Sequence, residues 1–210
     1  MRKTKEEAEE TRRAILRSAL DTFYEKGYSK TTFDEIARRI NLTKGAVYWY
    51  FRNKPDLIAA LINDYFDRQK AVLQERLPEM KSFDDILKWF LYNAEFILSS
   101  EPYYKFVFFI SCQMEWSEGI ITKVLSQVEE NKDTWYKRLK ETLTFMQKSG
   151  EICEDVNVEH LVSIIMNMWT GILNAYMSKR CTVDLKVMIE ESFNLIFNGL
   201  KKERTEDASK

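Results

Sequence analysis

The chain has few of the residues that support metal, redox or phosphate-loop chemistry. Its 210 residues include three cysteines, one histidine, six glycines and three prolines. Cys112, Cys153 and Cys181 are widely spaced, and no Cys-x-x-Cys or His-x-x-His pair occurs, so we predict no metal site. No secretory signal precedes them, which favours reduced thiols in a cytoplasmic protein; a redox-sensing cysteine is the alternative.

Motifs for enzyme chemistry and membrane insertion are also missing. There is no glycine-rich phosphate loop, and His160 has no evident catalytic partner, so we predict that the protein is not an enzyme and has no cofactor. The most apolar stretch, residues 161–177, is interrupted by polar residues, which argues against a membrane partner. These interruptions are Ser163, Asn167, Thr170 and Asn174.

Positive and negative charges nearly balance over the whole chain, whose net charge is -1. Residues 1–56, however, hold 13 lysines and arginines against 9 acidic residues, a balance of +4, and the remainder holds 19 against 24, a balance of -5. The positive charge therefore lies in the N-terminal part, where a DNA-contacting surface would need it. With 45% hydrophobic and 31% charged residues, the chain can bury a substantial core.

Residues 31–54 predict two short helices joined by a tight turn. Thr31 or Thr32 can cap the first helix, whose apolar residues recur with helical spacing. Asn41 tolerates the left-handed backbone that ends a helix, and Thr43 can cap the second helix, about residues 44–50. The expected buried residues of this pair are Phe33, Ile36, Ala37, Ile40, Leu42, Ala46, Val47 and Phe51.

The exposed residues of the second helix are of types that contact DNA. Lys44 can donate to guanine or to a phosphate, and Gly45 removes a side chain that would keep the backbone from the duplex. Hydroxyl groups and helix amino ends bind phosphate oxygens. Asn53 is the expected cap of the following helix, so Lys54 should reach the same DNA backbone. The predicted DNA-contacting residues are Thr31, Thr32, Thr43, Lys44, Gly45, Ala46, Tyr48, Trp49, Tyr50 and Lys54.

A helical hairpin with a polar, solvated face is the structural alternative for this segment. This segment combines a helix cap, a turn, a glycine, two aromatic residues and a lysine, at the spacing that a DNA-contacting helix needs. The combination favours DNA binding over the solvated hairpin. A good bidentate base contact contributes about 1 to 3 kcal/mol of discrimination, so one short helix cannot specify a site unless it is doubled. Arg2, Lys3 and Lys5 form either an arm near the DNA or an ordinary basic terminus.

The segment resembles the DNA-binding domain of the TetR family of transcriptional repressors. The family pattern of Thr, helix, turn, Thr-Lys/Arg-Gly-x-x-Tyr-x-x-Phe and Lys is matched by Thr31, Thr43-Lys44-Gly45, Tyr48, Phe51 and Lys54. The charged leader, residues 2–13, is similar to the branch that represses multidrug efflux pumps. Strong similarity covers residues 2–62, and beyond it only helical character and a stretch around Phe109 to Trp116 resemble that branch.

Nearly the whole remaining chain is predicted to be helical. The first helix should end at Gly27, and the later helices are expected at residues 54–77, 82–99, 102–116, 119–148, 158–178 and 183–200. We predict an all-α fold with two domains and a tail. Residues 1–53 would form a three-helix helix-turn-helix DNA-binding domain, residues 54–200 a helical effector-binding and dimerisation domain, and residues 201–210 a polar tail.

The two expected helices at 158–178 and 183–200 predict a dimer. They carry apolar residues on more than one face and so need cover on two sides. As the family resemblance implies, pairing with their copies would give a four-helix interface that presents two reading helices to one palindrome. A monomer in which both faces pack internally is the alternative. The predicted interface residues are Leu161, Ile165, Met168, Ile172, Tyr176, Leu185, Met188, Ile189, Ser192, Phe193, Ile196 and Phe197.

A stripe of polar or small residues on the 158–178 helix has two interpretations. It either lines a mostly apolar effector cavity or allows close packing in a dimer. Rings and methionines elsewhere favour a cavity for flat apolar ligands, although rings at helical spacing are more often core. The family resemblance adds Phe66 and Cys112. The predicted effector-binding residues are Phe66, Trp89, Asn93, Phe96, Phe109, Cys112, Gln113, Trp116, Trp135, Met166, Asn167, Thr170 and Asn174.

Together, the residues and the resemblance predict a dimeric transcriptional repressor released from a palindromic operator by a small hydrophobic or aromatic effector. The regulated gene would encode an efflux or transport protein. A response to a fatty-acyl or other metabolite, or activation in place of repression, is the alternative. The expected partners are operator DNA, the effector and a second copy of the chain. Phe66 and Cys112 stand where that branch can have acidic or imidazole groups, so a preference for cationic drugs does not transfer.

Overall fold

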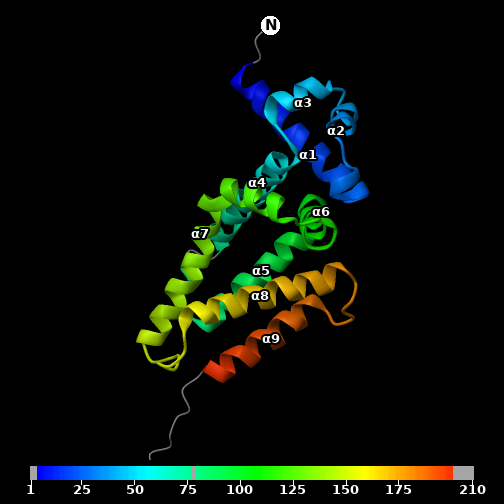
Figure 1. Ribbon diagram of the computed structural model, residues 1–210. Coiled ribbons are helices and arrows are strands. Elements are labelled where there is room, and N and C mark those ends of the chain that lie inside the picture. Colours follow the sequence, from blue (N-terminus) through cyan, green and yellow to red (C-terminus); the bar gives the residue numbers. More distant parts are fainter. Residues whose placement is uncertain (1–3, 77–78, 201–210) are drawn as a thin grey trace, which may run out of the picture. The chain divides into compact units, whose positions relative to one another are not determined.

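The computed structural model describes residues 4–76 and 79–200, without the side chains of residues 73, 74 and 129–135. Within these residues every regular element is a helix (Figure 1), which confirms the predicted all-α class. The elements are α1 Lys5–Lys30, α2 Phe33–Arg39, α3 Lys44–Tyr50, α4 Lys54–Arg76, α5 Phe83–Leu98, α6 Glu101–Phe108, the π-helical turn η1 Phe109–Gln113, α7 Glu118–Lys148, α8 Val158–Met177 and α9 Leu185–Leu200. The basic residues Arg2 and Lys3 and the predicted tail, residues 201–210, lie outside the described part.

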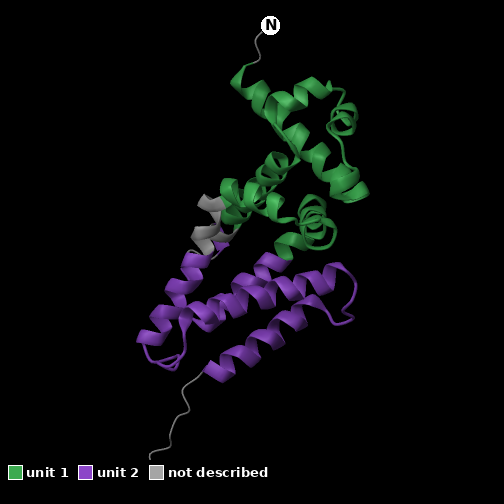
Figure 2. Ribbon diagram, in the orientation of Figure 1, with its two compact units in different colours: residues 1–72, 95–132 green, residues 73–94, 133–210 purple. Residues whose placement is uncertain are grey.

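The chain forms two compact units (Figure 2). Unit 1 comprises residues 1–72 and 95–132, and unit 2 comprises residues 73–94 and 133–210. The helices α4, α5 and α7 each contribute residues to both units. Unit 1 therefore holds the three N-terminal helices together with α6 and η1, whereas the predicted domain boundary at residue 53 stays a prediction.

α1 is the central helix of unit 1. Its first turn is closed by a capping box in which Thr4 accepts a hydrogen bond from the Glu7 backbone and the Glu7 side chain accepts one from Thr4. Gly27 interrupts it with φ of 76°, a conformation that glycine adopts without steric cost, and a last helical turn follows. Phe23 is fully buried and stacks on Phe109 of η1 with ring centroids 4.9 Å apart.

Local caps set most of the later helix boundaries close to their predicted positions. The Asn53 side chain accepts a hydrogen bond from the Asp56 backbone at the start of α4. Ser82 and Asp85 bond reciprocally at the start of α5, and Asn157 accepts from the backbone of His160 at the start of α8. Because a cap uses groups only three residues apart, the sequence alone is sufficient to place these helix ends.

The segment predicted as one helix, residues 102–116, is divided in the structure. α6 ends at Phe108, η1 follows, and the backbone at Met114 is extended. A π-helical turn inserts one residue per turn and rotates the side chains that follow. Here it accompanies the placement of Phe109 against Phe23 in the core.

The core of unit 2 is built from α8 and α9 packed with rings of α5. Phe90 is fully buried, with its ring centroid 5.1 Å from that of Trp169 and 4.5 Å from that of Phe193. This arrangement corrects the prediction for the dimer interface. Seven of the predicted interface residues are buried within a single protomer: Leu161, Ile165, Ile172, Leu185, Ile189, Phe193 and Phe197.

Candidate DNA-reading surface and effector sites

The turn between α2 and α3 has the geometry predicted from sequence. Thr32 caps α2 in a capping box with Glu35. Asn41 adopts φ of 56°, in the left-handed region, and the Leu42 backbone donates to the Ala37 carbonyl over 2.9 Å. Thr43 then caps α3 by accepting a hydrogen bond from the Ala46 backbone at 3.2 Å. α3 is thus held in a fixed direction relative to α2.

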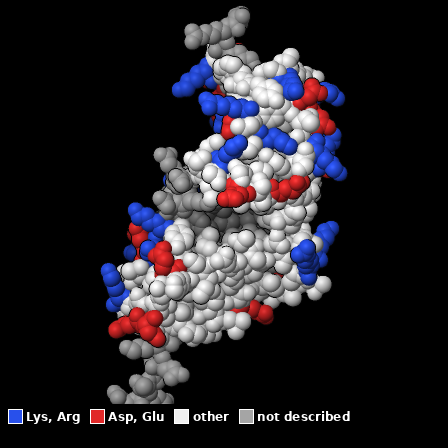
Figure 3. All heavy atoms as spheres, viewed as in Figure 1, with Lys and Arg blue, Asp and Glu red and all other residues white. Residues whose placement is uncertain are grey.

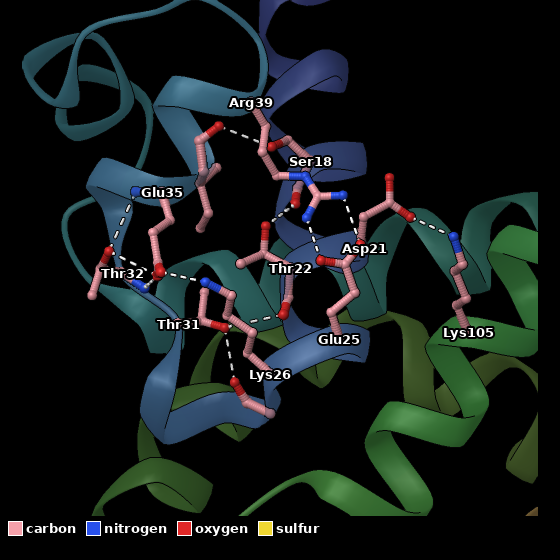
Figure 4. Close-up of polar contacts among 12 residues, drawn as sticks. Ser18, Asp21, Thr22, Glu25, Lys26, Thr31, Thr32, Glu35, Arg39 and Lys105 are labelled. Atoms are coloured by element: carbon pink, nitrogen blue, oxygen red, sulfur yellow. Dashed lines mark hydrogen bonds and ion pairs between the residues drawn. The ribbon is translucent and has the colours of Figure 1, made fainter.

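α2 is in turn held on α1 by a polar network (Figure 4). The Ser18 hydroxyl, which is buried, donates to the Ile36 carbonyl over 2.8 Å. Arg39 makes a bidentate ion pair with Glu25 over 2.6 and 2.8 Å. The hydrogen bond from Arg39 is the main reason why the pKa of Glu25 lies below its usual value. The three N-terminal helices are therefore positioned as one body.

The outer face of α3 is exposed and carries the predicted reading residues. Val47 is fully buried beneath it, while Tyr48 and Trp49 are 49% and 74% exposed. Lys44 and Gly45 are exposed as well. A Cβ added to Gly45 would meet only the Thr43 hydroxyl, at 3.9 Å, so the fold itself does not require glycine here. The missing side chain instead leaves the α3 backbone open to a molecule that approaches from outside.

Tyr48 is held in place from two sides. Its ring centroid lies 4.8 Å from that of Phe33, and the Lys44 ammonium lies over its ring at 5.7 Å from the centroid. Phe33 is buried at the start of α2. The cation and the phenol are therefore presented together, close to one another before any ligand is bound.

A groove of about 430 Å³ lies beside α3. Its wall contains three cations, Lys44, Arg52 and Lys54, and hydroxyl groups of the segment before α2. Arg52 is exposed and was not among the predicted contacts, although its position two residues before Lys54 is the signal that could have identified it. Figure 3 shows that lysines and arginines also gather over the N-terminal helices. Such a groove suits a phosphate backbone.

Lys54 occupies a different position from the predicted one. Its ammonium donates to the Tyr28 carbonyl over 2.8 Å and to the Ser29 carbonyl over 3.3 Å, and it lies 4.3 Å from the centroid of the Tyr28 ring. Burial lowers the pKa of the Lys54 ammonium. The ammonium therefore bonds the end of α1 to the start of α4 while it lines the groove, and its contact with DNA stays a prediction.

Thr31 also departs from its predicted role. Its side chain is 1% exposed, and its hydroxyl donates to the Gly27 carbonyl over 2.8 Å (Figure 4). The hydroxyl therefore bonds within the bend that follows α1 and is not presented to a phosphate. Its neighbour Thr32 remains exposed at the groove. Of the other predicted contacts, Thr43 is exposed, and Ala46 and Tyr50 are half-buried.

The predicted effector residues are divided between the two units, and their common site stays a prediction. Phe66, Phe96, Phe109, Cys112, Gln113 and Trp116 belong to unit 1, and Trp89, Asn93, Met166, Asn167, Thr170 and Asn174 to unit 2. The side chain of Trp135 lies outside the described residues. Phe96 stacks on Tyr103 with centroids 4.0 Å apart, so it packs α5 against α6. Cys112 and Trp116 are exposed, and Gln113 donates to the Tyr24 carbonyl over 3.1 Å.

Asn93 is the predicted effector residue with the clearest unmet polar group. It is 1% exposed in unit 2, and its Oδ1 has no hydrogen-bond donor in the part of the chain that the structure describes. A buried amide oxygen without a donor is costly, so it is a natural contact for a polar group on a ligand. Trp89, one turn earlier on α5, is buried as well.

The polar stripe of α8 is exposed and bonded to its own helix. Ser163 and Thr170 donate to the carbonyls four residues earlier, Glu159 and Met166. The Asn167 amide donates to the Ser163 carbonyl over 2.9 Å. All three side chains are exposed in a single protomer, and both interpretations of the stripe stay predictions.

The described residues also bear on metal binding and membrane insertion. Among the described residues, no group of three or more His, Cys, Asp or Glu side chains is placed to hold a metal ion. Over the same residues, no helix is both long and apolar enough to cross a membrane.

A capped turn, a short exposed helix and a cationic groove on a three-helix body define a helix-turn-helix DNA-binding protein. Comparison with known proteins shows which family of DNA-binding proteins this chain resembles. Residues 15–61 match the family described as bacterial regulatory proteins, tetR family. This chain therefore has TetR-family transcriptional regulators as its homologues, and the fold with an N-terminal helix-turn-helix and a C-terminal helical part is theirs.

Three of these similar proteins cover most of the chain. The transcriptional repressor BepR of Brucella suis biovar 1 (strain 1330) is 28% identical over 200 residues, which cover 95% of this chain and 91% of BepR. The structure of NalD, the secondary repressor of the MexAB-OprM multidrug efflux pump in Pseudomonas aeruginosa, aligns with a TM-score of 0.73 at 22% identity over 94% of this chain and 98% of NalD. FadR of Bacillus subtilis, solved in complex with stearoyl-CoA, aligns with a TM-score of 0.72 at 17% identity over 90% of this chain and 98% of FadR.

Proposed function

We propose that the protein is a ligand-relieved repressor that binds a palindromic operator as a homodimer. The observation that carries the proposal is the exposed face of α3, where Lys44, Gly45 and Tyr48 are presented on a body fixed by α1 and α2. The regulated gene would encode an efflux or transport protein, because NalD represses an efflux pump and relatives such as BepR and the "Probable acrEF/envCD operon repressor" of Escherichia coli are named as repressors.

The dimer is supported by apolar residues that a single protomer leaves uncovered on α8 and α9. Ile164 is 55% exposed and Leu195 is 77% exposed. Gly171, also exposed, would let a second helix approach closely. Pairing α8 and α9 with their copies would cover these residues and double the reading helix. The interface would then be formed by exposed residues of α8 and α9 such as Ile164 and Leu195. These residues lie close in the sequence to the buried residues that were predicted to form it.

The effector is proposed to be small and largely apolar. Asn93 offers a buried amide oxygen without a partner, and the neighbouring Trp89 offers a ring. Because α4 runs without interruption from unit 1 into unit 2, a ligand that favours one position of α4 would alter the separation of the two reading helices. That separation must match successive major grooves, roughly 34 to 36 Å apart. The ligand acts only through its different affinities for the two arrangements.

Footprinting on the DNA upstream of the gene and of its neighbours tests the proposal. We expect protection of a palindrome and its loss on addition of Nile red, a neutral hydrophobic dye. Release by stearoyl-CoA and not by Nile red would instead favour a fatty-acyl signal, the class of ligand bound in the FadR structure. Salt-sensitive binding that is indifferent to sequence would refute the repressor.

Lys44→Ala separates base reading from general attraction to DNA. One lost base contact should weaken specific binding by about 1 to 3 kcal/mol, with a smaller change on non-specific DNA. The matched control is Lys137→Ala, which removes an exposed lysine of α7 in unit 2. Equal losses on both DNAs would remove Lys44 from the base-reading role. Both affinities can be measured by fluorescence anisotropy at one salt concentration.

A further inference from the structure

A second cavity, unrelated to the predicted effector residues, lies within unit 1. It has a volume of about 370 Å³ and is walled by α1, α4 and α6 with the residue that precedes α6. Binding sites for small molecules usually have volumes of about 300 to 1,000 Å³. The cavity is therefore large enough for a compact ligand, and it touches none of the residues assigned above to DNA or effector binding.

The floor of this cavity is apolar and is supplied by all three helices. Leu16 of α1, Leu61 of α4 and Phe106 of α6 line it, and each is less than a tenth exposed. Tyr65 and Tyr103 add two rings whose centroids lie 6.1 Å apart at 75°. Leucines and rings at right angles form the kind of surface on which a flat apolar body packs.

The rim of the same cavity is cationic. Three of its lining residues are Arg13, Arg17 and Arg68, and its one carboxylate is Asp64. Asp64 pairs with Arg68 over 3.0 Å, and Arg13 pairs with Glu9 over 3.2 Å on the exposed surface of α1. Arg17 is exposed and makes no ion pair with the described residues. The lining therefore carries three positive charges and one negative charge, a net charge of +2.

We propose that this cavity binds a small aromatic carboxylate, with its ring on the apolar floor and its carboxylate at Arg17 and Arg68. A planar guanidinium donates two parallel hydrogen bonds to a carboxylate, which makes arginine the side chain suited to such recognition. A neutral ligand would fill the floor but would leave Arg17 without an ion-pair partner. The proposed ligand thus differs in charge and location from the apolar effector, and its binding does not depend on the protein being a repressor.

Titration calorimetry of the full chain with 2-naphthoate tests this site. The neutral control is 2-naphthalenemethanol, which has the same rings without the carboxylate. We expect one 2-naphthoate per chain, an affinity that falls as salt rises, and binding of the alcohol that is at least about ten-fold weaker, as is typical for loss of a charge-assisted hydrogen bond. Equal affinity for the two compounds would overturn the proposal.

The protein variant that tests it is Arg17→Gln/Arg68→Gln, with Arg180→Gln as the matched control. Arg180 is an exposed arginine after α8, in unit 2. The double variant should bind 2-naphthoate at least about ten-fold more weakly, and the control should bind it like the wild type. Binding that is unchanged in the double variant would place the ligand elsewhere and refute the site.

A thermal shift provides a second readout that detects misfolding. Both arginines are at the surface, so the double variant should unfold with the wild-type cooperativity in the absence of ligand. Saturating 2-naphthoate should then raise the unfolding temperature of the wild type and of Arg180→Gln, because a ligand that binds only the folded state stabilises it. An equal rise in the double variant would contradict the proposed arginine contacts.

Discussion

At the scale of single residues, Thr31 and Thr32 are adjacent and chemically identical but perform different tasks. Thr31 is buried and donates to the Gly27 carbonyl, whereas Thr32 is exposed and caps α2. Both carry a side-chain hydroxyl that can cap a helix, so sequence reasoning could not separate them. The difference arises from the bend at Gly27, which turns one hydroxyl inward.

Replacement of Thr31 by valine should destabilise the protein without removing a DNA contact. Valine keeps the shape but leaves the Gly27 carbonyl without its donor, which costs about 1 to 2 kcal/mol. We expect a lower midpoint of chemical denaturation and an operator affinity within about two-fold of wild type when the protein is folded. Thr32→Val is the comparison, since it should lower both. A folded Thr31→Val protein that loses operator affinity as strongly as Thr32→Val would restore Thr31 as a contact.

Glu35 makes the stability of the N-terminal helices dependent on pH. Hydrogen bonds from Lys26 and then from Thr32 hold the pKa of Glu35 below its ordinary value of 4.5. Because the folded pKa is lowered, the carboxylate stabilises the fold fully above pH 4.5, and this contribution is lost as pH falls through the folded value.

Glu35→Gln should therefore reduce the acid sensitivity of folding. We expect the unfolding temperature of the wild type to fall more than that of the variant between about pH 6 and pH 3. Circular dichroism melts at a series of pH values measure this difference. Glu10→Gln, which changes an exposed glutamate of α1, is the control. Identical pH profiles for wild type and Glu35→Gln would contradict the prediction.

At the scale of elements, α6 and η1 connect to α1 through polar bonds. Lys105 of α6 donates to Asp21 of α1 over 2.7 Å (Figure 4) and also pairs with Glu101 over 2.8 Å. These hydrogen bonds, Asp21 first, raise the pKa of Lys105. From η1, Gln113 donates to the Tyr24 carbonyl. Movement of α6 would therefore be transmitted to the helix that holds the DNA-binding body.

Lys105→Met should weaken the response to an effector more than DNA binding itself. The substitution removes the ion pair between α6 and α1 and keeps most of the apolar stem. We expect effector-induced loss of operator affinity to diminish by about 0.5 to 2 kcal/mol, with the affinity of the effector-free protein nearly unchanged. Anisotropy titrations with and without Nile red measure both quantities. Lys88→Met, which breaks a pair within α5, is the control and should leave the response intact.

At the level of the whole molecule, two features bear on assembly. Three helices are shared by the two units, and α8 and α9 leave apolar residues exposed. α4, α5 and α7 run through both units, so neither unit is an uninterrupted stretch of chain. The exposed Ile164 and Leu195 are not used within a protomer. A second copy of the chain that covered them would complete the DNA-binding assembly that a single reading helix is too weak to provide.

Leu195→Arg should therefore produce a monomer. An arginine at this exposed position would place a charge in an apolar interface, where an unpaired charge is strongly unfavourable. Light scattering after size exclusion should show the mass of one chain, and the palindrome should no longer be bound specifically. The matched control is Phe145→Arg, at another exposed apolar position, on α7. A dimeric Leu195→Arg protein would exclude this surface as the interface.

Most of the helices, their caps and the turn before α3 follow from the amino-acid sequence alone. Thr43, Asn41 and Asn53 act on groups within a few residues of themselves, so their roles follow from short-range geometry. The family resemblance likewise depended on a short local pattern. The boundary between α6 and η1 was not predictable in this way, because the core position of Phe109 depends on Phe23, far away in the sequence.

The face that each helix buries depends on packing between distant parts of the chain. The apolar stripes of α8 and α9 were predicted to meet a second copy, yet many of their residues form the core of unit 2, and exposed Leu195 was not among the predicted residues. The bonds from Lys54 to the carbonyls of Tyr28 and Ser29 were not predicted, for the same reason. Periodicity shows that a face is apolar, but the partner that covers it comes from distant parts of the chain, and burial is settled only when they pack together.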